Sequence, residues 1–333
     1  MLKNCSCRKI GFGLVLFFLF LNTASPLAAG PPPLKKVTFI PQWVPQAQFA
    51  GYYVALETGI YQEHGLDVEI ISGGPQRSSA DYLANKKADF ASLWLVTALD
   101  LCNQGIKVVN LAQIVQRSAL MLVAKKSSGI LKPTDLEGRK VGLWGSPFAI
   151  QPEAFFKQYG LTVEPLQQSY SINLFLRDGV DVASAMWYNE YHSLLNAGIN
   201  PEELTTFFYY EHGLNYPEDG LYVLQQTRQQ QPELCRAFVA ASLKGWRRAF
   251  AEPELALDII MRNLKKEHVI TNRIHQKWML ERMRDIILPP AEELSLGRLK
   301  EEDFHRVAAS LISQNIIDTA PNFNEFHHAQ TGE

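Results

Sequence analysis

The sequence predicts an α/β protein with two lobes, which are joined by a hinge and enclose a cleft. Apolar residues alternate over residues 37–40, recur at helical spacing over residues 49–60 and alternate again over residues 66–70. A looser version of the same strand, helix and strand pattern recurs about 100 residues later, which indicates two related halves. Extended segments over residues 121–125 and 216–224 are placed to carry the chain between the halves, and hinged lobes of this kind close on small ligands.

The first half reads as a strand, a helix and a second strand. The helix presents one apolar face, formed by Phe49, Tyr52, Tyr53, Leu56 and Ile60. Gly59 is placed to end that helix, because glycine accepts the left-handed conformation common at helix ends. Alternation resumes in "LDVEI", residues 66–70, which predicts the second strand.

Three short segments of the first half have counterparts in the second half. The pairs are Lys36-Val37 with Lys140-Val141, "GLDVE" (65–69) with "GLTVE" (160–164), and "ADFASLW" (88–94) with "VDVASAMW" (180–187). Each match is weak alone, but all three occur in the same order. We therefore expect two α/β lobes of the same construction.

The pattern becomes helical from residue 232 onward, and the last residues are polar. We assign residues 35–123 and 222–320 to the first lobe and residues 124–221 to the second lobe. Residues 321–333 are expected to form a loose tail.

Length and composition fit a folded protein of this size. The 333 residues allow two compact lobes or one large α/β domain, and 47% of them are hydrophobic and 20% charged. A formal net charge of −2 gives no reason to expect nucleic acid or an anionic membrane surface as a partner.

The N-terminus has the features of a secretory signal peptide. Basic residues precede an apolar run over residues 10–21 that is short for a membrane span, and Ala29 suits a cleavage site. We predict a cleavable signal peptide over residues 1–29 and export to the periplasm. An uncleaved membrane anchor is the alternative, which the proline-rich residues 31–33 disfavour.

Aromatic residues follow the predicted strands at the carboxyl ends, where α/β sheets gather ligands. They are Trp43, Trp94, Trp144 and the pair Trp187-Tyr188. A tryptophan in a globular protein is often simply part of the core, and that reading stays open for each one. Together they predict aromatic walls on opposed lobes, which would stack on a planar, heteroaromatic ligand.

Polar candidates lie beside these aromatic residues. Glu190 could accept hydrogen bonds from ring NH or amino groups, although it could instead be a solvated glutamate on the next helix. Ser78 follows two glycines and precedes a helix, where it could bind an acceptor or anion, or only cap the helix. Phe148 lies in the matching loop of the second half and is a further candidate.

Motifs of catalysis and metal binding are absent from the sequence. It has no phosphate loop, no nucleophile elbow and no zinc motif, and its eight histidines have no ligand spacing. We expect no catalytic residue, cofactor or metal. After cleavage only Cys102 and Cys235 remain, and we interpret them as two buried free thiols, although one disulfide is possible.

Four stretches together resemble the NMT1/THI5-like group of periplasmic substrate-binding proteins. They are "FIPQWVPQAQFAGYYVALETGIYQEHGLDVEI", "LKPTDLEGRKVGLWG", "VASAMWYNEY" and "YPEDGLYVL", and the resemblance covers residues 35–311. It implies the type II periplasmic-binding fold, in which two α/β lobes hinge about a ligand. Bacterial members deliver small molecules to ABC importers; thiamine pyrimidine precursors are the best-known ligands, and relatives take up riboflavin, sulfonates or nitrate.

The chain departs from two patterns of that family. A fungal branch makes the thiamine pyrimidine from pyridoxal phosphate and carries a lysine and a histidine where this chain has Leu93 and Thr97. Without a lysine the Schiff base of that chemistry is lost. Pyrimidine-binding members show an asparagine and a histidine after Trp43 and Pro45, where this chain has Gln46 and Phe49, so the ligand could differ.

These observations predict an exported, monomeric solute-binding protein of an ABC importer. Its ligand would be a small heteroaromatic molecule such as a thiamine pyrimidine precursor, held by the aromatic residues and Glu190. The alternatives are a pyridoxal-phosphate-dependent pyrimidine synthase, a carrier of riboflavin, sulfonate or nitrate, and a ligand-binding protein that serves a membrane sensor.

Overall fold

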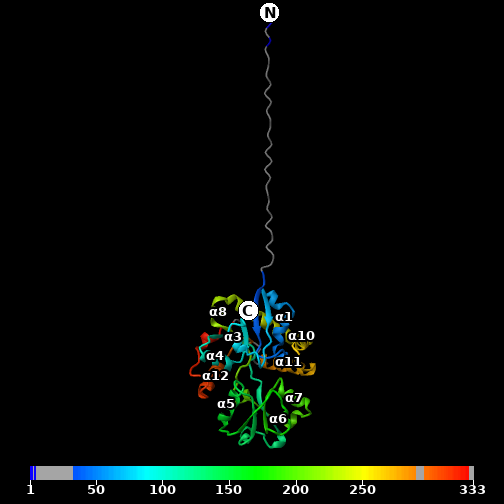
Figure 1. Cartoon of the computed structure of the whole chain (residues 1–333), viewed down its shortest axis with the longest axis vertical. Coiled ribbons are helices and arrows are strands. Elements are labelled where there is room, and N and C mark those ends of the chain that lie inside the picture. The colour runs from blue at the N-terminus through cyan, green and yellow to red at the C-terminus, as the bar shows by residue number, and fades with distance from the viewer. Residues whose placement is uncertain (3, 5–32, 290–295, 330–333) are drawn as a thin grey trace. The chain divides into compact units, whose positions relative to one another are not determined.

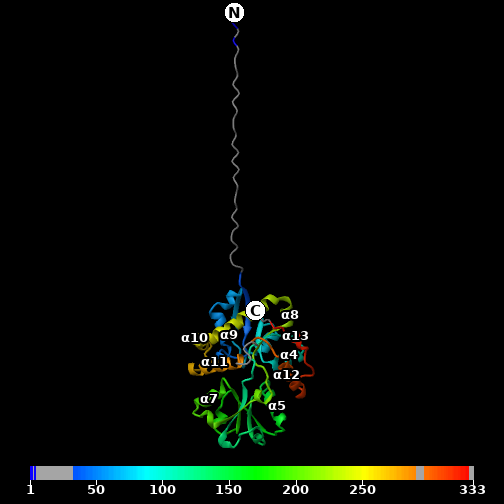
Figure 2. The same ribbon diagram turned by 180° about the vertical axis from the view of Figure 1, so that it is seen from behind.

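The computed structural model describes residues 1–2, 4, 33–289 and 296–329 of the chain. Nearly all of the predicted signal peptide, residues 1–29, lies outside these residues. Met1–Pro33 and Leu34–Glu333 are separate units, and the second unit contains two lobes (Figures 1 and 2). None of the helices in the described ranges has the length and apolar character that crossing a bilayer requires.

Each lobe is built on a five-stranded mixed sheet. In spatial order the first sheet consists of β2 (Leu66–Ile70), β1 (Lys35–Ile40), β3 (Phe90–Leu93), β10 (Gly220–Leu224) and β4 (Val108–Gln113). The second consists of β7 (Glu164–Gln167), β6 (Lys140–Leu143), β8 (Val182–Met186), β5 (Leu120–Lys125) and β9 (Leu204–Phe208). The predicted two-lobed α/β architecture is confirmed.

The two sheets have the same pattern of strand directions. β1 runs parallel to β2 and β3, while β10 is antiparallel to β3 and β4. Likewise β6 is parallel to β7 and β8, while β5 is antiparallel to β8 and β9. The central strands β3 and β8 are buried along their whole length, as expected for strands covered by helices on both faces.

Helices surround the two sheets unequally. The first lobe carries α1 (Ala50–Glu57), α2 (Ile60–Glu63), α3 (Ser79–Ala84), α4 (Leu95–Asn103), α8 (Gln225–Gln230), α9 (Pro232–Ala251), α10 (Pro253–Lys266), α11 (Arg273–Ile287), α12 (Glu301–Ser313) and α13 (Phe323–Phe326). The second lobe carries α5 (Ile150–Tyr159), α6 (Asn173–Leu176) and α7 (Glu190–Asn196), which Figure 1 shows around the other sheet.

Short 3₁₀ turns complete the fold. They are η1 (Ala47–Phe49), η2 (Lys126–Ser128), η3 (Pro133–Leu136), η4 (Pro201–Glu203) and η5 (Tyr209–His212). η1 lies directly before α1, in the loop that leaves the carboxyl end of β1. It therefore helps to place the residues that follow the first strand.

The helices α1 and α9 pack closely because both have a glycine at their contact. A Cβ atom on Gly245 would lie 2.2 Å from the carbonyl oxygen of Gly51, and one on Gly51 would lie 2.3 Å from the Trp246 ring. Tyr52 and Phe238 fill the interior beside this contact, where both are fully buried. The predicted apolar face of the first helix is thus core.

Two crossover segments join the lobes, and hydrogen bonds tie them to each other. Glu218, which precedes β10, accepts from the backbone N of Ala119 at 2.6 Å and from Ser118 Oγ at 2.9 Å, just before β5. Asn215 Oδ1 accepts from the backbone N of Ser118 at 2.9 Å. The hinge is therefore a pair of extended segments tied by hydrogen bonds rather than two independent linkers.

Strand pairing places the ends of the lobes a few residues from the predicted division. β5 pairs with β8 from Leu120 onward, so residues 120–123 belong to the second sheet. β10 pairs with β3 from Gly220, so residues 220–221 belong to the first sheet. A strand pairs for as long as its backbone groups reach those of the neighbouring strand. The apolar pattern of the sequence does not show where that pairing begins or ends.

The prediction of a loose tail from residue 321 is wrong for the part that the structure describes. Phe326 in α13 is only 1% exposed, and the backbone N of His328 donates to the carbonyl oxygen of Asn110 at 2.9 Å. His327 Nδ1 lies 2.8 Å from Asn110 Oδ1. One buried aromatic ring and these hydrogen bonds fix the segment against β4, although most of its residues are polar.

Candidate ligand-binding site

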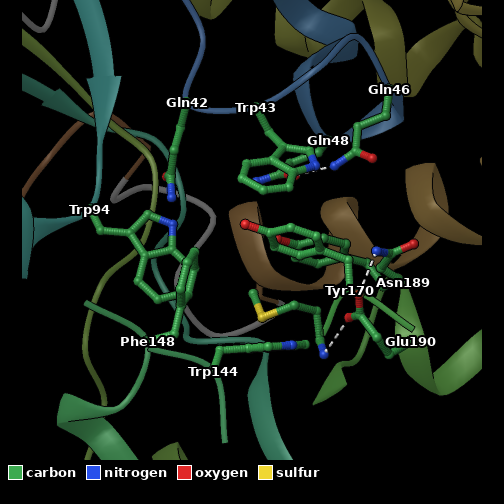
Figure 3. A pocket seen from close by; sticks show the side chains of 12 residues that line it. Gln42, Trp43, Gln46, Gln48, Trp94, Trp144, Phe148, Tyr170, Asn189 and Glu190 are labelled. Carbon is green, nitrogen blue, oxygen red and sulfur yellow. Dashed lines mark hydrogen bonds between the residues drawn. The ribbon is translucent and has the colours of Figure 1, made fainter. Parts of the chain in front are cut away.

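A cavity lies between the lobes at the carboxyl ends of the parallel strands. It has a volume of about 90 Å³, and residues from both lobes line it (Figure 3). The lining residues are Gln42, Trp43, Gln46, Gln48 and Trp94 of the first lobe and Trp144, Phe148, Tyr170, Met186, Tyr188, Asn189 and Glu190 of the second. The segments that follow β1, β3, β6, β7 and β8 bring these residues together, as the strand-end rule predicts.

Aromatic rings from opposite lobes meet across this cavity. The rings of Trp94 and Phe148 are 4.8 Å apart at 83°, and those of Trp43 and Tyr170 are 5.1 Å apart at 62°. Trp144 packs edge to face on Phe148 and donates its Nε1 hydrogen to the carbonyl oxygen of Ser169 at 3.0 Å. Edge-to-face pairs hold these rings in fixed orientations while the lobes are closed.

Two buried polar atoms on the cavity wall have no partner within the described part of the chain. They are the indole Nε1 of Trp94 and the amide Oε1 of Gln42. A buried polar atom without a hydrogen bond costs about 1–3 kcal/mol. One free donor and one free acceptor beside an aromatic box are suited to a ligand that has both kinds of group.

Glu190 supplies a carboxyl group to the same cavity. It is 7% exposed and accepts from the backbone N of Met186 at 3.0 Å and from Asn189 Nδ2 at 2.8 Å (Figure 3). Burial raises the pKa of Glu190 to about 7, against these hydrogen bonds, which lower it. The alternative of a solvated glutamate is therefore wrong.

Further buried carboxyl groups lie behind the glutamine wall. Gln46 Nε2 donates to Gln48 Oε1, and Gln48 Nε2 donates to Asp219 Oδ2 at 2.6 Å. Burial raises the pKa of Asp219 to about 7, and burial with the neighbouring Asp219 raises that of Glu218 to about 8. Burial and these carboxyl groups also raise the pKa of Tyr188 well above its ordinary value.

The charge of the site is thus acidic or neutral. Among the described residues that line the cavity, none is a lysine, an arginine or a histidine. The structure also has no group of three or more histidine, cysteine, aspartate or glutamate side chains able to hold a metal in its described ranges. Cys102 and Cys235 are both free, as interpreted, but only Cys235 is buried, whereas Cys102 is partly exposed.

Six of the eight residues selected from the sequence line this cavity. They are Trp43, Trp94, Trp144, Phe148, Tyr188 and Glu190. Trp187 points elsewhere, because its ring packs on Phe208 at 5.5 Å and under the guanidinium of Arg282 at 4.9 Å. Ser78 is an exposed N-cap of α3, whose side chain accepts from the backbone N of Asp81 at 3.2 Å, so helix capping explains it.

The sequence analysis missed a set of polar and aromatic lining residues. They are Gln42, Gln48, Tyr170, Met186 and Asn189, together with Gln46, which had been noted only as a departure from the family. Gln42, Gln46 and Gln48 follow β1 within a few residues, so the strand-end rule could have included them. Tyr170 follows β7 in the same way, but its strand is short and mostly exposed.

Comparisons with known proteins agree with this architecture. The family model described as NMT1/THI5 like matches residues 46–256. The riboflavin-binding protein RibY of Chloroflexus aurantiacus is 27% identical over 71% of this chain and 69% of its own length. The formylaminopyrimidine-binding protein of Halalkalibacterium halodurans is 24% identical over 75% of this chain and 77% of its own length.

A solved structure shows the same fold. The periplasmic aliphatic sulphonate binding protein SsuA from Escherichia coli superposes with a TM-score of 0.71 at 12% identity, covering 88% of this chain and 91% of the other. This likeness confirms the predicted periplasmic-binding-protein fold and carries no information about the ligand. Because the family model spans more than half of the residues, the chain belongs to the NMT1/THI5-like family.

Proposed function

We propose that the protein is an exported solute-binding protein of an ABC importer, and that it encloses an uncharged or cationic planar heteroaromatic molecule. A thiamine pyrimidine precursor is the leading ligand. The observation that carries the proposal is a cavity with aromatic walls from both lobes, a buried carboxyl group and an unpaired indole NH. A monomer working with a membrane permease is the simplest form of such a carrier.

The ligand would be held by stacking and by two kinds of hydrogen bond. Trp43, Trp94 and Tyr188 would contact its ring faces and edges. Glu190 would accept from a ring NH or amino group, and Trp94 Nε1 would donate to a ring nitrogen. A 4-aminopyrimidine has both kinds of group, an amino donor and ring-nitrogen acceptors.

Charge makes an anionic ligand a weaker candidate. A sulfonate or nitrate would bring a negative charge next to Glu190 without a basic residue in the described lining. An unpaired buried charge is costly, since ions lose several kcal/mol of hydration on burial. We therefore propose neither a sulfonate nor nitrate as the ligand.

Riboflavin is the second candidate, because a riboflavin-binding protein is among the similar relatives. Its ring system has three fused rings. The cavity has a volume of only about 90 Å³, and aromatic rings from its two opposite walls contact each other. A single ring fits such a cavity with little movement of the lobes. A tricyclic ligand would require a more open cleft.

A carrier also fits the residues better than a pyrimidine synthase does. Leu93 ends a fully buried strand, and Thr97 lies in α4, where the family's enzyme branch has its lysine and histidine. The described lining has no amine that could form a Schiff base with pyridoxal phosphate. We propose that the protein needs no cofactor and catalyses no reaction.

Calorimetry on refolded, ligand-free protein tests the proposal. The probes are 4-amino-5-hydroxymethyl-2-methylpyrimidine, riboflavin and an alkanesulfonate. We expect the pyrimidine to bind with a Kd of about 1 μM, a typical affinity for a small buried ring with several hydrogen bonds. Binding of the sulfonate without the other two would overturn the ligand class, and an absorbance band with pyridoxal phosphate would overturn the carrier role.

A further inference from the structure

A second contact joins the lobes beside the cavity, where α7 of the second lobe meets α11 of the first. The Nδ1 atoms of His192 and His275 lie 2.9 Å apart. Trp278 stacks on His192 with ring centres 4.9 Å apart at 13°, and its Nε1 donates to the carbonyl oxygen of Trp187 at 3.0 Å. These contacts lie outside the hinge, so they form only when the cleft is closed.

Asn189 connects this contact to the carboxyl group in the cavity. Its Nδ2 donates to Glu190 Oε1 at 2.8 Å (Figure 3). Its Oδ1 lies 2.8 Å from His275 Nε2. An amide oxygen only accepts, so His275 carries a hydrogen on Nε2. When both rings are neutral, His275 Nδ1 therefore accepts a hydrogen from His192 Nδ1. Asn196 Nδ2, which can only donate, lies 3.2 Å from the same His192 nitrogen and favours the form of His192 that accepts there.

Protonation of both rings destroys this arrangement. A singly charged pair keeps the bond, because a charged His275 donates from Nδ1 to a neutral His192 that carries its hydrogen on Nε2, whereas in a doubly charged pair two N–H groups face each other across 2.9 Å. Two positive rings are then in direct contact. The bond between the lobes becomes a repulsion.

The charged groups around the pair come from α7 and α11. Glu190 reaches it through Asn189, and the guanidinium of Arg282 lies 4.7 Å from the centre of the Trp278 ring that stacks on His192. Arg273 on α11 instead pairs with Glu254 and Asp258 of α10. The loop before α11, residues 269–272, has no ionisable side chain.

We propose that His192, His275 and Asn189 form a pH-sensitive latch that holds the lobes closed, with Glu190 in place, while at least one of the two histidines is neutral. Acidification protonates both histidines and opens the cleft. Burial first, and the charge of His192 second, lower the pKa of His275 below its ordinary value, so the latch stays closed at neutral pH. The proposal rests on the proposed function, because the latch closes the proposed ligand cavity.

Small-angle X-ray scattering of the ligand-free protein tests the latch without any assumption about the ligand. The radius of gyration is measured at about pH 7.5 and about pH 4.5, on either side of the ordinary histidine pKa. We expect the wild type to be compact at the higher pH and larger at the lower pH. His275→Ala should be larger at both values, while circular dichroism confirms that it is folded.

His192→Asn is the decisive variant. An asparagine amide reaches the position of Nδ1 and can either donate to neutral His275 or accept from charged His275. This variant should therefore stay compact at both pH values, whereas the control His305→Ala, at an exposed histidine of α12, should behave like the wild type. A wild type that keeps one radius, or a His192→Asn protein that opens like the wild type, overturns the latch.

Binding of 4-amino-5-hydroxymethyl-2-methylpyrimidine separates the latch from the ligand assignment. At about pH 4.5 the His192→Asn protein should bind it about 10-fold more tightly than the wild type, while at about pH 7.5 the two should be equal. Comparison at one pH cancels the titration of the pyrimidine itself. The expected scattering results without pyrimidine binding would refute only the ligand, and pyrimidine binding with unchanged scattering would refute only the latch.

Discussion

The two lobes share a strand order but differ in the helices around it. The first lobe contains α9 with 20 residues and α11 with 15, whereas the longest helix of the second lobe, α5, has 10. The first lobe is thus a larger packed body, onto which the smaller one closes. Both nevertheless supply aromatic walls to the cavity, so a ligand makes all its contacts only in the closed state, which is the condition for ligand-driven closure.

The largest expected difference between the lobes is in their tolerance of an added methyl group. In the first lobe Gly245→Ala would place a Cβ 2.2 Å from the carbonyl oxygen of Gly51, which is backbone and cannot turn away. In the second lobe Gly142→Ala would meet Gln168 Oε1 at 2.6 Å, the end of a side chain that can turn away only by giving up its hydrogen bond from the backbone N of Ser184. We expect losses of unfolding free energy of about 3 and about 1 kcal/mol respectively, measured by urea denaturation.

Gly145→Ala is the control for this pair, because a Cβ there has no heavy atom within 4 Å among the described residues. Its unfolding free energy should change by less than about 0.5 kcal/mol. Equal losses for the Gly245 and Gly142 variants would mean that α1 and α9 can move apart. The first lobe would then not be the more rigid body.

The next comparison is between two tryptophans at equivalent strand ends. Trp94→Ala removes a cavity wall and the free Nε1 donor, so the Kd of the ligand should rise about 100-fold. Trp187→Ala should change it by less than about 3-fold, because Trp187 packs on Phe208 and Arg282 outside the cavity. Calorimetry with the best probe measures both.

Trp94→Phe separates the ring from its hydrogen bond. It keeps an aromatic face but lacks the donor, so we expect a rise in Kd of about 10-fold. A Trp187 variant that weakens binding as much as the Trp94 variant would place the ligand outside the cavity. The strand-end argument would then hold for both tryptophans alike.

These two tryptophans also show how much of the candidate site can be predicted from the sequence. Apolar alternation located the strands and their ends, and with them the cavity, because the edge of a parallel sheet collects whatever follows each strand. Apolar alternation did not show which way the side chains at the strand ends point. Trp94 follows the four-residue β3, whereas Trp187 follows the five-residue β8, and one extra residue turns a side chain to the other face. Met186 therefore lines the cavity and Trp187 does not.

Residues that act through contacts between distant parts of the chain could not be predicted from local sequence patterns. Gln48 reaches Asp219, 171 positions along the chain, and His275 lies beside Asn189, 86 positions away. Each is an ordinary polar residue in its own segment, without a local pattern that marks it. Only packing of the lobes brings these side chains together, and that packing depends on the whole tertiary structure.

Two buried ionisable residues, one in each lobe, respond to pH in opposite ways. In the second lobe the pKa of Glu190 is raised from 4.5 to about 7 by burial. Its contribution to stability is complete below pH 4.5 and is lost as the pH rises through about 7, because the unfolded carboxyl ionises first. Glu190→Gln should remove up to about 3 kcal/mol of this decline in unfolding free energy.

Urea unfolding between about pH 4.5 and about pH 8 measures the decline, with Glu63→Gln at an exposed glutamate as the control. In the Glu190 variant the decline of unfolding free energy with pH should become smaller but not vanish, since Glu218 and Asp219 also have raised pKa values. An unchanged slope in the Glu190 variant would show that this carboxyl is solvated in the folded protein.

In the first lobe the sign is reversed, at His327. Burial lowers its pKa from 6.5 to about 4, and its ring accepts from the backbone N of Leu299 at 3.2 Å while contacting Asn110 Oδ1 at 2.8 Å. The stability it contributes is complete above pH 6.5 and is lost as the pH falls through about 4, because the unfolded imidazole takes up its proton first. His327→Gln should therefore reduce the acid-induced loss of unfolding free energy by about 1–2 kcal/mol, since the ring is partly exposed.

His305→Ala, at an exposed histidine, should leave that loss unchanged. Equal behaviour of the two variants would mean that the C-terminal segment is not fixed to β4 through the His327 ring.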